Sequence, residues 1–194
     1  MSKIGLGVIT HNREDFYKQC CESIPLDVID HVVTVNDGQP YEYNLPGMYF
    51  YQNFENLGVG KSKNKAMNHL LKCGCEHIFL IEDDIVIKQK DVFQKYIDTA
   101  RASGIWHLMY GYHGPANKTQ SKDPAPRLIV DYKDHQVALN RHCVGAFCYY
   151  HKGVLKNIGL MDEEFRNAWE HVEHSYQIVK AGLLPGDWWW PDVA

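Results

Sequence analysis

Short apolar runs rich in β-branched residues recur through the first half of the chain and predict buried β-strands. They are Ile4–Thr10, Val28–Val35, Met48–Gln52 and His77–Ile81. Helical spacing of apolar residues over Glu14–Ser23, and again within Gly58–Cys73, places helices between these strands. This alternation predicts an α/β fold, in which a mostly parallel central sheet carries helices on both faces.

The second half of the chain shows shorter elements. Helices are expected over Asp91–Ser103, Lys152–Ile158 and His171–Ala181, and strands over Trp106–Gly111, Leu128–Asp131, Gln136–Asn140 and Val144–Tyr150. The middle two strands can pair, which adds a small antiparallel portion. The polar segment His113–Pro126 is long enough to form a mobile lid. The tryptophans Trp188–Trp190 are too apolar for a free tail, so they either pack back on the domain or lead into further chain.

Length and composition fit one soluble globular domain over residues 1–194. The formal net charge of −4 argues against a nucleic-acid partner, which normally requires a basic patch. The sequence has no apolar run of the ~20 residues that a membrane span needs, and its apolar start lacks a signal-cleavage pattern. We therefore expect a cytoplasmic protein with reduced cysteines, a metal site at Cys73-Gly74-Cys75 being the weaker alternative.

Polar clusters follow three of the predicted strands, at Thr10–Arg13, Asn36–Gly38 and Glu82–Asp84. The carboxyl ends of parallel strands meet at one edge of a sheet, which is where such sheets bind ligands. Consecutive acidic residues next to a buried strand cost free energy, so the placement of Glu82-Asp83-Asp84 needs an explanation. Carboxylates suit Mg²⁺ or Mn²⁺, which are typically shared between protein carboxylates and substrate phosphates. The alternative is a solvated turn with acids at a helix N-terminus.

A glycine-rich stretch, Asn56–Ala66, enters a predicted helix and contains Gly58, Gly60 and three lysines. Backbone N–H groups at such a helix start can bind an anion. The spacing matches neither the phosphate-binding loop of nucleoside triphosphatases nor the dinucleotide-binding fingerprint. The alternative interpretation is an ordinary strand-to-helix turn whose lysines are solvated.

Acids and histidines alternate over Trp169–His174, where Glu170 and His174 share a helix face at i, i+4. Both residue types can act as a general base in a suitable environment. The H-E-x-x-H order of zinc peptidases is absent. A helix N-terminus enriched in acids, which favour the positive end of the helix dipole, is the simpler alternative.

In order along the chain, these segments resemble the GT-A glycosyltransferases, most closely the family-2-like inverting enzymes. Val8–Arg13 looks like the opening strand and nucleotide loop, and Val35–Gly38 like the second-strand motif. Asn56–Ala66 is similar to the N-x-G-x-x-x-A-R-N-x-G stretch, and Glu82-Asp83-Asp84 occupies the D-x-D position. Trp169–Glu173 is similar to the W-G-x-E-D-x-E region, and the late segments resemble polypeptide N-acetylgalactosaminyltransferases. The resemblance runs from Ile4 to about Gly186 and implies a GT-A (Rossmann-like) fold.

The resemblance also implies a metal-dependent transfer of a sugar from a nucleoside-diphosphate sugar, expected to be a UDP-sugar, to an acceptor hydroxyl. Asp84 would ligate Mn²⁺ or Mg²⁺, and Glu82 would do so directly or through water. The donor would be contacted by Thr10, Asn12, Arg13, Asp37, Gly58, Lys63, Asn64 and Asp83. Trp169 would lie on the acceptor side. Residues 1–87 would form the nucleotide-sugar-binding half and residues 88–194 the acceptor-side half, with truncation at the C-terminus left open.

Two residues depart from the family pattern. Lys63 stands where an arginine is usual, which keeps the charge but loses the bidentate fork. His171 stands where an aspartate base is usual, so either Glu170 or His171 is the catalytic base. Inversion at the anomeric carbon is expected, with retention as the alternative.

Other functions remain open at this stage. A nucleotide-sugar-binding accessory module with little or no turnover would keep the donor pocket. A sugar-phosphate nucleotidyltransferase is disfavoured because its glycine-rich N-terminal signature is absent. The acceptor could be a glycan, a lipid-linked sugar or another hydroxyl compound. Trp106, Tyr110, Tyr112 and Trp169 are candidates for stacking on sugar rings.

Overall fold

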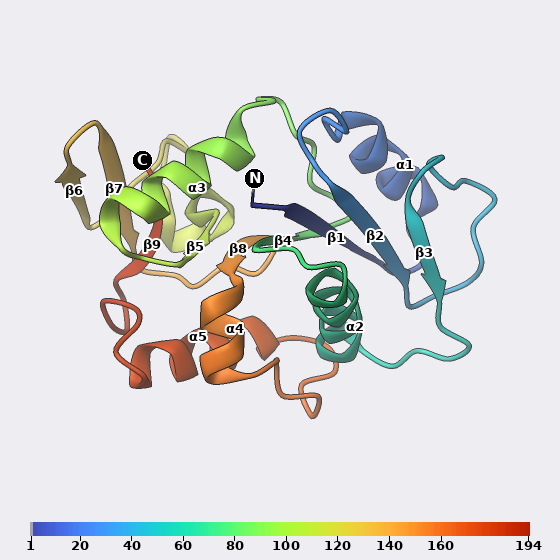
Figure 1. Ribbon diagram of the computed structural model, residues 1–194. Coiled ribbons are helices and arrows are strands. Elements are labelled where there is room, and N and C mark those ends of the chain that lie inside the picture. Colours follow the sequence, from blue (N-terminus) through green and yellow to red (C-terminus); the bar gives the residue numbers. More distant parts are fainter. Residues whose placement is uncertain (1) are drawn as a thin grey trace.

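The computed structural model describes residues 2–194 and is built on a six-stranded sheet with the strand order β3-β2-β1-β4-β8-β5 (Figure 1). The strands are β1 (Ile4–Thr10), β2 (His31–Asn36), β3 (Tyr49–Gln52), β4 (His77–Glu82), β5 (His107–Met109) and β8 (Phe147–His151). Strands β1 to β4 are parallel, whereas β8 runs antiparallel to both β4 and β5. The predicted α/β fold with a mostly parallel sheet is therefore confirmed.

Helices cover both faces of this sheet (Figure 1). Helices α1 (Glu14–Ser23) and α3 (Val92–Ser103) lie on one face. Helices α2 (Val59–Lys72), α4 (Lys152–Ile158) and α5 (Glu170–Lys180) lie on the other. None of the helices formed by residues 2–194 combines the length and apolar character needed to cross a membrane.

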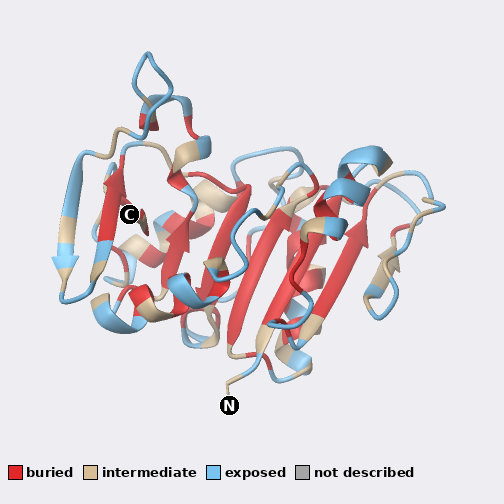
Figure 2. Cartoon of the chain, turned by 90° about the horizontal axis from the view of Figure 1, so that it is seen from above, coloured by how far each residue is buried: buried red, intermediate tan, exposed pale blue. Residues whose placement is uncertain are grey.

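The central strands β1, β2 and β4 form the core and are buried along almost their whole length (Figure 2). Helix α2 packs on these strands through Ala66, Met67 and Leu70, which are fully buried. A Cβ at Gly7 in β1 would lie 2.9 Å from the Cβ of Ala66, so only glycine allows this close approach. The apolar spacing of the α2 sequence thus fixes the helix against the strands that carry the polar clusters.

A second, three-stranded antiparallel sheet has the order β6-β7-β9. Its strands are β6 (Leu128–Tyr132), β7 (His135–Asn140) and β9 (Trp190–Val193). Strand β9 brings the tryptophan-rich tail back onto the domain, and Trp190 is 6% exposed. The tail therefore packs back, which was one of the two expectations from sequence.

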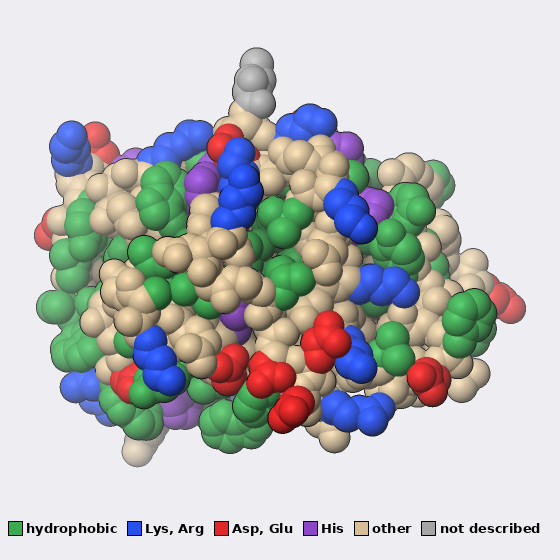
Figure 3. Space-filling view, turned by 60° about the horizontal axis from the view of Figure 1, so that its bottom comes forward, with side chains coloured by type: hydrophobic (Ala, Val, Ile, Leu, Met, Phe, Trp, Pro, Cys, Tyr) green, Lys and Arg blue, Asp and Glu red, His purple; other side chains and the backbone are tan. Residues whose placement is uncertain are grey.

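The segment expected to be a polar lid contains two short 3-10 helices, η1 (Gly111–His113) and η2 (Pro115–Asn117). The buried Asn117 side chain donates to the carbonyls of Gly111 and His142 and accepts from the backbone of Arg141 and His142. These hydrogen bonds fasten the segment to the loop after β7. On the face shown in Figure 3, Lys and Arg side chains are scattered and do not gather in one basic patch.

Candidate functional site

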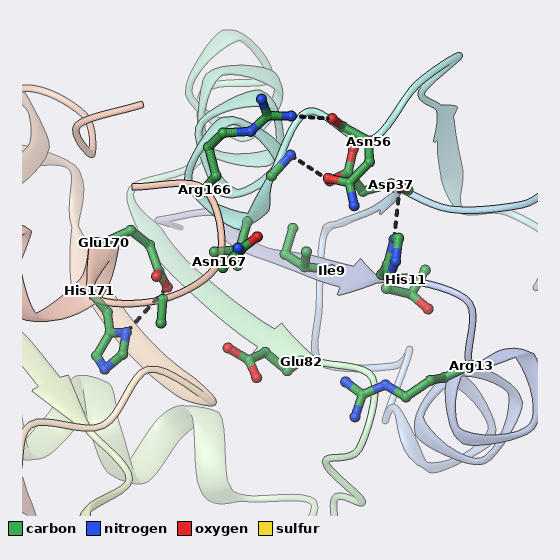
Figure 4. Close-up of a pocket in the computed structure, with 14 residues that line it drawn as sticks. Ile9, His11, Arg13, Asp37, Asn56, Glu82, Arg166, Asn167, Glu170 and His171 are labelled. Atoms are coloured by element: carbon green, nitrogen blue, oxygen red, sulfur yellow. Dashed lines mark hydrogen bonds and ion pairs between the residues drawn. The ribbon is translucent and has the colours of Figure 1, made fainter. Parts of the chain in front are cut away.

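A pocket of about 370 Å³ lies at the carboxyl ends of β1, β2 and β4 (Figure 4). The polar clusters after these strands meet there with the glycine-rich loop and the start of α5. The wall is formed by Ile9, Thr10, His11, Arg13, Asp37, Asn56, Gly58, Val59, Glu82, Arg166, Asn167, Ala168, Glu170 and His171. Of the residues expected from sequence, the wall includes Thr10, Arg13, Asp37, Gly58, Glu82, Glu170 and His171.

Asp37 anchors the turn that leads into α2. Its Oδ1 accepts from the backbone N–H of Leu57 at 2.8 Å and from the Asn53 amide at 2.7 Å. Its Oδ2 accepts from the backbone N–H of Gly58 at 2.8 Å. Because the carboxylate is 4% exposed and holds three donors, its main role in this structure is to position the glycine-rich loop.

The glycines of that loop are required by close packing against the segment before α5. Gly58 has φ +94°, and a Cβ there would lie 2.7 Å from the carbonyl oxygen of Arg166. A Cβ at Gly60 would lie 2.9 Å from the carbonyl oxygen of Phe165. Val59 donates its backbone N–H to that same Arg166 oxygen at 2.8 Å, which caps the start of α2. The loop was expected either to bind an anion or to form an ordinary strand-to-helix turn, and the packing alone accounts for both glycines.

Two amide side chains that were expected to contact the donor lie outside the pocket wall. Each forms hydrogen bonds to the backbone of another segment of the chain. Asn64 pairs with the backbone of Met161, donating to its carbonyl at 2.8 Å and accepting from its N–H at 2.9 Å. Asn12 accepts from the backbone N–H of Gln39 at 2.7 Å and joins the loops after β1 and β2. Both residues shape the pocket by holding its loops together.

The three carboxylates of the acid motif lie in different environments. Asp83 is fully buried and accepts from Thr10 Oγ1 at 2.7 Å and from the Arg13 guanidinium. Burial raises the pKa of Asp83, and the hydrogen bond from Thr10 and the Arg13 charge partly offset that effect. Asp84 is partly exposed and pairs with Arg13 at 3.2 Å. Glu82 points into the pocket (Figure 4).

The acid motif leaves two carboxylate oxygens available to a hard divalent cation, although only Glu82 of the motif lines the pocket wall. Oε2 of Glu82 and Oδ1 of Asp84 make no hydrogen bond to any atom of residues 2–194, so each can serve as a hard oxygen ligand. Within the same residues there is no group of three or more His, Cys, Asp or Glu placed to hold a metal. Two carboxylates suffice where phosphates and water supply the remaining ligands, as is usual for Mg²⁺ and Mn²⁺.

Lys63 is buried between the acid motif and the start of α5. Its Nζ donates to Glu82 Oε1 at 3.0 Å, to Glu170 Oε1 at 2.7 Å and to the Gly145 carbonyl at 3.2 Å. Burial alone would lower the pKa of Lys63, but the charges of Glu82 and Glu170 outweigh it and raise the pKa. The lysine therefore stays protonated and ties together two carboxylates that face the same pocket. It lies outside the pocket wall, so it acts on a ligand only through those carboxylates.

Glu170 and His171 form a hydrogen-bonded pair at the far wall of the pocket (Figure 4). His171 Nδ1 donates to Glu170 Oε1 at 3.2 Å, and the imidazole ring packs on the backbone of Gly145. Burial would raise the pKa of Glu170, yet the hydrogen bond from His171 and the charge of Lys63 lower it to about 2. The Oε2 atom of Glu170 is buried without a hydrogen-bond partner among the described residues. Glu170 is thus an ionised carboxylate that orients its neighbour.

Trp169 lies at the N-cap of α5 and does not line this pocket. Its side chain is 65% exposed and lines a second, wider groove that also contains His171. The backbone of Trp169 adopts φ +75°, a left-handed conformation that is rare for a bulky residue. The sequence-based expectation that Trp169 lies on the acceptor side therefore concerns that groove and not the first pocket.

Four polar residues of the pocket wall were not among those expected from sequence: His11, Asn56, Arg166 and Asn167. Arg166 donates from Nη2 to the Asn56 carbonyl at 2.8 Å and closes the rim above the glycine-rich loop (Figure 4). The available signal was its position three residues before Trp169, in the stretch leading into the acidic helix start. That signal was weak, because a single exposed arginine in a loop is common in any soluble protein.

No family model matches the chain, and no curated protein matches it. Solved structures do match in fold. Residues 1–349 of TarS from S. aureus superpose with a TM-score of 0.60 at 20% identity, covering 89% of this chain and 54% of that one. GalNAc-T7 gives 0.59 at 10% identity, covering 100% of this chain and 42% of that one. Glucosyl-3-phosphoglycerate synthase from Mycobacterium tuberculosis gives 0.64 at 12% identity, covering 96% and 66%.

The fold is that of the GT-A glycosyltransferases. The match to GalNAc-T7 agrees with the resemblance of the late segments to that group of enzymes. Open α/β sheets bind ligands outside the carboxyl ends of their strands, and the pocket opens at that edge of β1, β2 and β4. The chain spans about half the length of the TarS and GalNAc-T7 structures that it matches.

Proposed function

We propose that the chain acts as a metal-dependent glycosyltransferase that uses a UDP-sugar and inverts the anomeric carbon. The observation that carries this proposal is one pocket, in a GT-A fold, with Glu82 of the acid motif on one side and the Glu170–His171 pair on the other. Two structures of similar fold were solved with UDP and Mn²⁺, namely GalNAc-T7 and glucosyl-3-phosphoglycerate synthase. Their overall likeness makes a nucleotide-sugar donor the natural ligand to test.

The donor side of the pocket is formed by the ends of β1 and β4. Glu82 and Asp84 would hold Mn²⁺ or Mg²⁺, which stabilises negative charge on a leaving diphosphate as a Lewis acid. Thr10 and Arg13 lie beside them and hold Asp83 in place. The exposed guanidinium of Arg166 at the opposite rim is available for a phosphate oxygen. These residues would orient the donor so that its anomeric carbon faces α5.

His171 is the better of the two candidates for the catalytic base. Glu170 Oε1 already accepts from Lys63 and His171, and its depressed pKa makes it a weak proton acceptor. Donation of Nδ1–H to Glu170 leaves Nε2 of His171 as the proton acceptor. We assign Glu170 as a positioning residue, which fixes the tautomer and orientation of the imidazole.

The reaction follows from these roles. His171 Nε2 takes the proton of an acceptor hydroxyl, and the oxygen forms a bond to the anomeric carbon. The bond between that carbon and the diphosphate oxygen breaks, and the diphosphate leaves with the electron pair. Attack from the face opposite the diphosphate inverts the anomeric centre.

Nucleotide binding tests the donor side directly. Calorimetric titration of the protein with UDP should give saturable binding with Mn²⁺ and loss of most of that binding in EDTA. Asp84→Asn should weaken Mn²⁺-dependent binding at least ten-fold. Asp91→Asn, which alters an exposed acid paired only with Lys95, should leave it unchanged. GDP serves as the comparison nucleotide.

The outcomes separate the two candidate functions. Metal-dependent UDP binding without any turnover would favour the accessory-module alternative. Absence of UDP and GDP binding under every condition would refute a nucleotide-sugar site at this pocket.

A further inference from the structure

A wide groove adjoins the donor pocket and shares two residues with it, Ala168 and His171. Its volume is about 850 Å³, more than twice that of the donor pocket. The loop before α5, the outer face of α5 and the tail leading into β9 form its walls. His171 therefore faces the donor on one side and this groove on the other.

Three large aromatic side chains in the groove are left exposed. Trp169 is 65% exposed, Trp188 59% and Tyr176 41%. Folding normally covers tryptophan because of its large apolar surface, and an exposed aromatic group that lines a concave surface is typical of a binding site. The groove thus offers flat aromatic faces next to the residue assigned as the base.

The two tryptophans are also held in a strained backbone conformation. Trp169 has φ +75° and Trp188 has φ +66°, both in the left-handed region that favours glycine. The Trp169 carbonyl accepts from the backbone N–H of Glu173 at 2.9 Å within α5, so the strain is fixed by the helix start. Backbone strain of this kind persists only where the surrounding structure holds it, and it clusters at functional sites.

The groove carries charged and polar groups alongside the aromatic ones. Arg141, His142, Glu173 and Asp187 lie on its walls. The residues Arg141 and Asp187 are both exposed. A hydrocarbon chain would remove these charged groups from water without compensation, which is costly. A molecule that presents both apolar faces and hydroxyl groups suits the groove better.

We propose that this groove binds the acceptor as an oligosaccharide, with pyranose rings stacked on Trp169 and Trp188. The C–H face of a pyranose is apolar and lies flat on an aromatic ring, while its hydroxyl groups point sideways to Arg141, Glu173 and Asp187. One hydroxyl of the terminal sugar then reaches His171 at the junction with the donor pocket. This inference rests on the proposed function, and it identifies the acceptor as an oligosaccharide.

A glycan-binding measurement without donor tests the groove by itself. The protein is titrated with oligosaccharides of hexose, N-acetylhexosamine and uronic acid units, and tryptophan fluorescence and calorimetry follow binding. At least one class should bind, and Trp169→Ala and Trp188→Ala should each weaken it at least ten-fold. Phe54→Ala, which removes an apolar side chain that is fully exposed elsewhere, should leave binding unchanged.

UDP binding with Mn²⁺, measured on the same samples, separates this proposal from the proposed function. Both tryptophan variants should keep wild-type UDP affinity, which also shows that they are folded. Glycan binding with no UDP binding would refute the proposed function and would still support glycan binding in the groove. Failure of every oligosaccharide class to bind, equal affinity in both tryptophan variants, or binding of phosphatidylcholine vesicles in place of glycans would overturn the groove assignment.

Discussion

Lys63 and Glu170 form a buried ion pair that joins α2 to α5 across 107 residues of sequence, with Nζ and Oε1 2.7 Å apart. The same Nζ holds Glu82, so one side chain links the acid motif to the residue that orients His171. Lys63→Met should leave two carboxylates without their cation and lower the free energy of unfolding by about 3–5 kcal/mol. Urea denaturation measures the difference.

The neighbouring lysine provides the control for this change. Lys61 lies two residues earlier on α2, is 44% exposed and contacts Glu163 only at 4.0 Å. Lys61→Met should alter the free energy of unfolding by no more than about 0.5 kcal/mol. Equal effects of the two substitutions would show that the buried pair contributes nothing specific.

Lowering the pH should decrease the free energy of unfolding through protonation of Glu170. Its pKa falls from the ordinary 4.5 to about 2 in the folded protein, so its stabilising contribution is complete above pH 4.5 and disappears as the pH falls towards 2. The shift corresponds to roughly 3 kcal/mol at neutral pH. Unfolding free energies measured from pH 6 to pH 2 should fall less steeply in Glu170→Gln than in the native protein. Parallel pH curves would contradict the assignment.

A substitution at Gly145 can displace the His171 ring without changing the histidine itself. A Cβ at Gly145 would lie 2.5 Å from Cγ and 2.6 Å from Nδ1 of the imidazole, so Gly145→Ala must displace the ring. The displacement should reduce kcat at least ten-fold, because the base loses its hydrogen bond to Glu170. UDP binding should persist, since the donor side is untouched. Gly153→Ala, where the Cβ meets only the His151 ring at 3.0 Å, is the control.

The close contact at Gly58 should be visible in stability. Gly58 and Gly74 both have positive φ, +94° and +80°, but only Gly58 is crowded by the Arg166 backbone. Gly74→Ala should cost about 1–2 kcal/mol from backbone strain alone. Gly58→Ala should cost more and also weaken UDP binding, because it pushes Arg166 away from the pocket rim. A smaller loss in Gly58→Ala than in Gly74→Ala would contradict the packing described for this loop.

Periodicity was sufficient to predict the main elements of the fold. The apolar residues of strands β1 and β4 and of helices α1, α2 and α4 follow spacings that identify strands and helices locally. Strand β9 (Trp190–Val193) escaped prediction because it is short, contains a proline and owes its conformation to pairing with β7. Such pairing depends on partners about fifty residues away, which a local pattern does not encode.

The segments that line the candidate pocket could be predicted from the sequence, but the environments of single side chains could not. Motif order identified the ends of β1, β2 and β4, and the structure brings them together around one pocket. Lys63 was expected near the donor, but its burial between Glu82 and Glu170 was not predicted, because nothing in a lysine-rich helix start shows which lysine is buried. Asp83 was expected to face the donor, but its burial against Thr10 and Arg13 gives it an internal role. These distinctions depend on tertiary packing.

Turnover with a nucleotide sugar tests the central claim most directly. UDP release is followed from a panel of UDP-sugars with an oligosaccharide acceptor, in Mn²⁺, in Mg²⁺ and in EDTA. The native protein should release UDP from one donor only when metal is present. Asp84→Ala should abolish that release, and His171→Ala should reduce kcat while UDP affinity stays unchanged. Release that is equally fast in EDTA, or that survives in both variants, would contradict the proposed site and its mechanism.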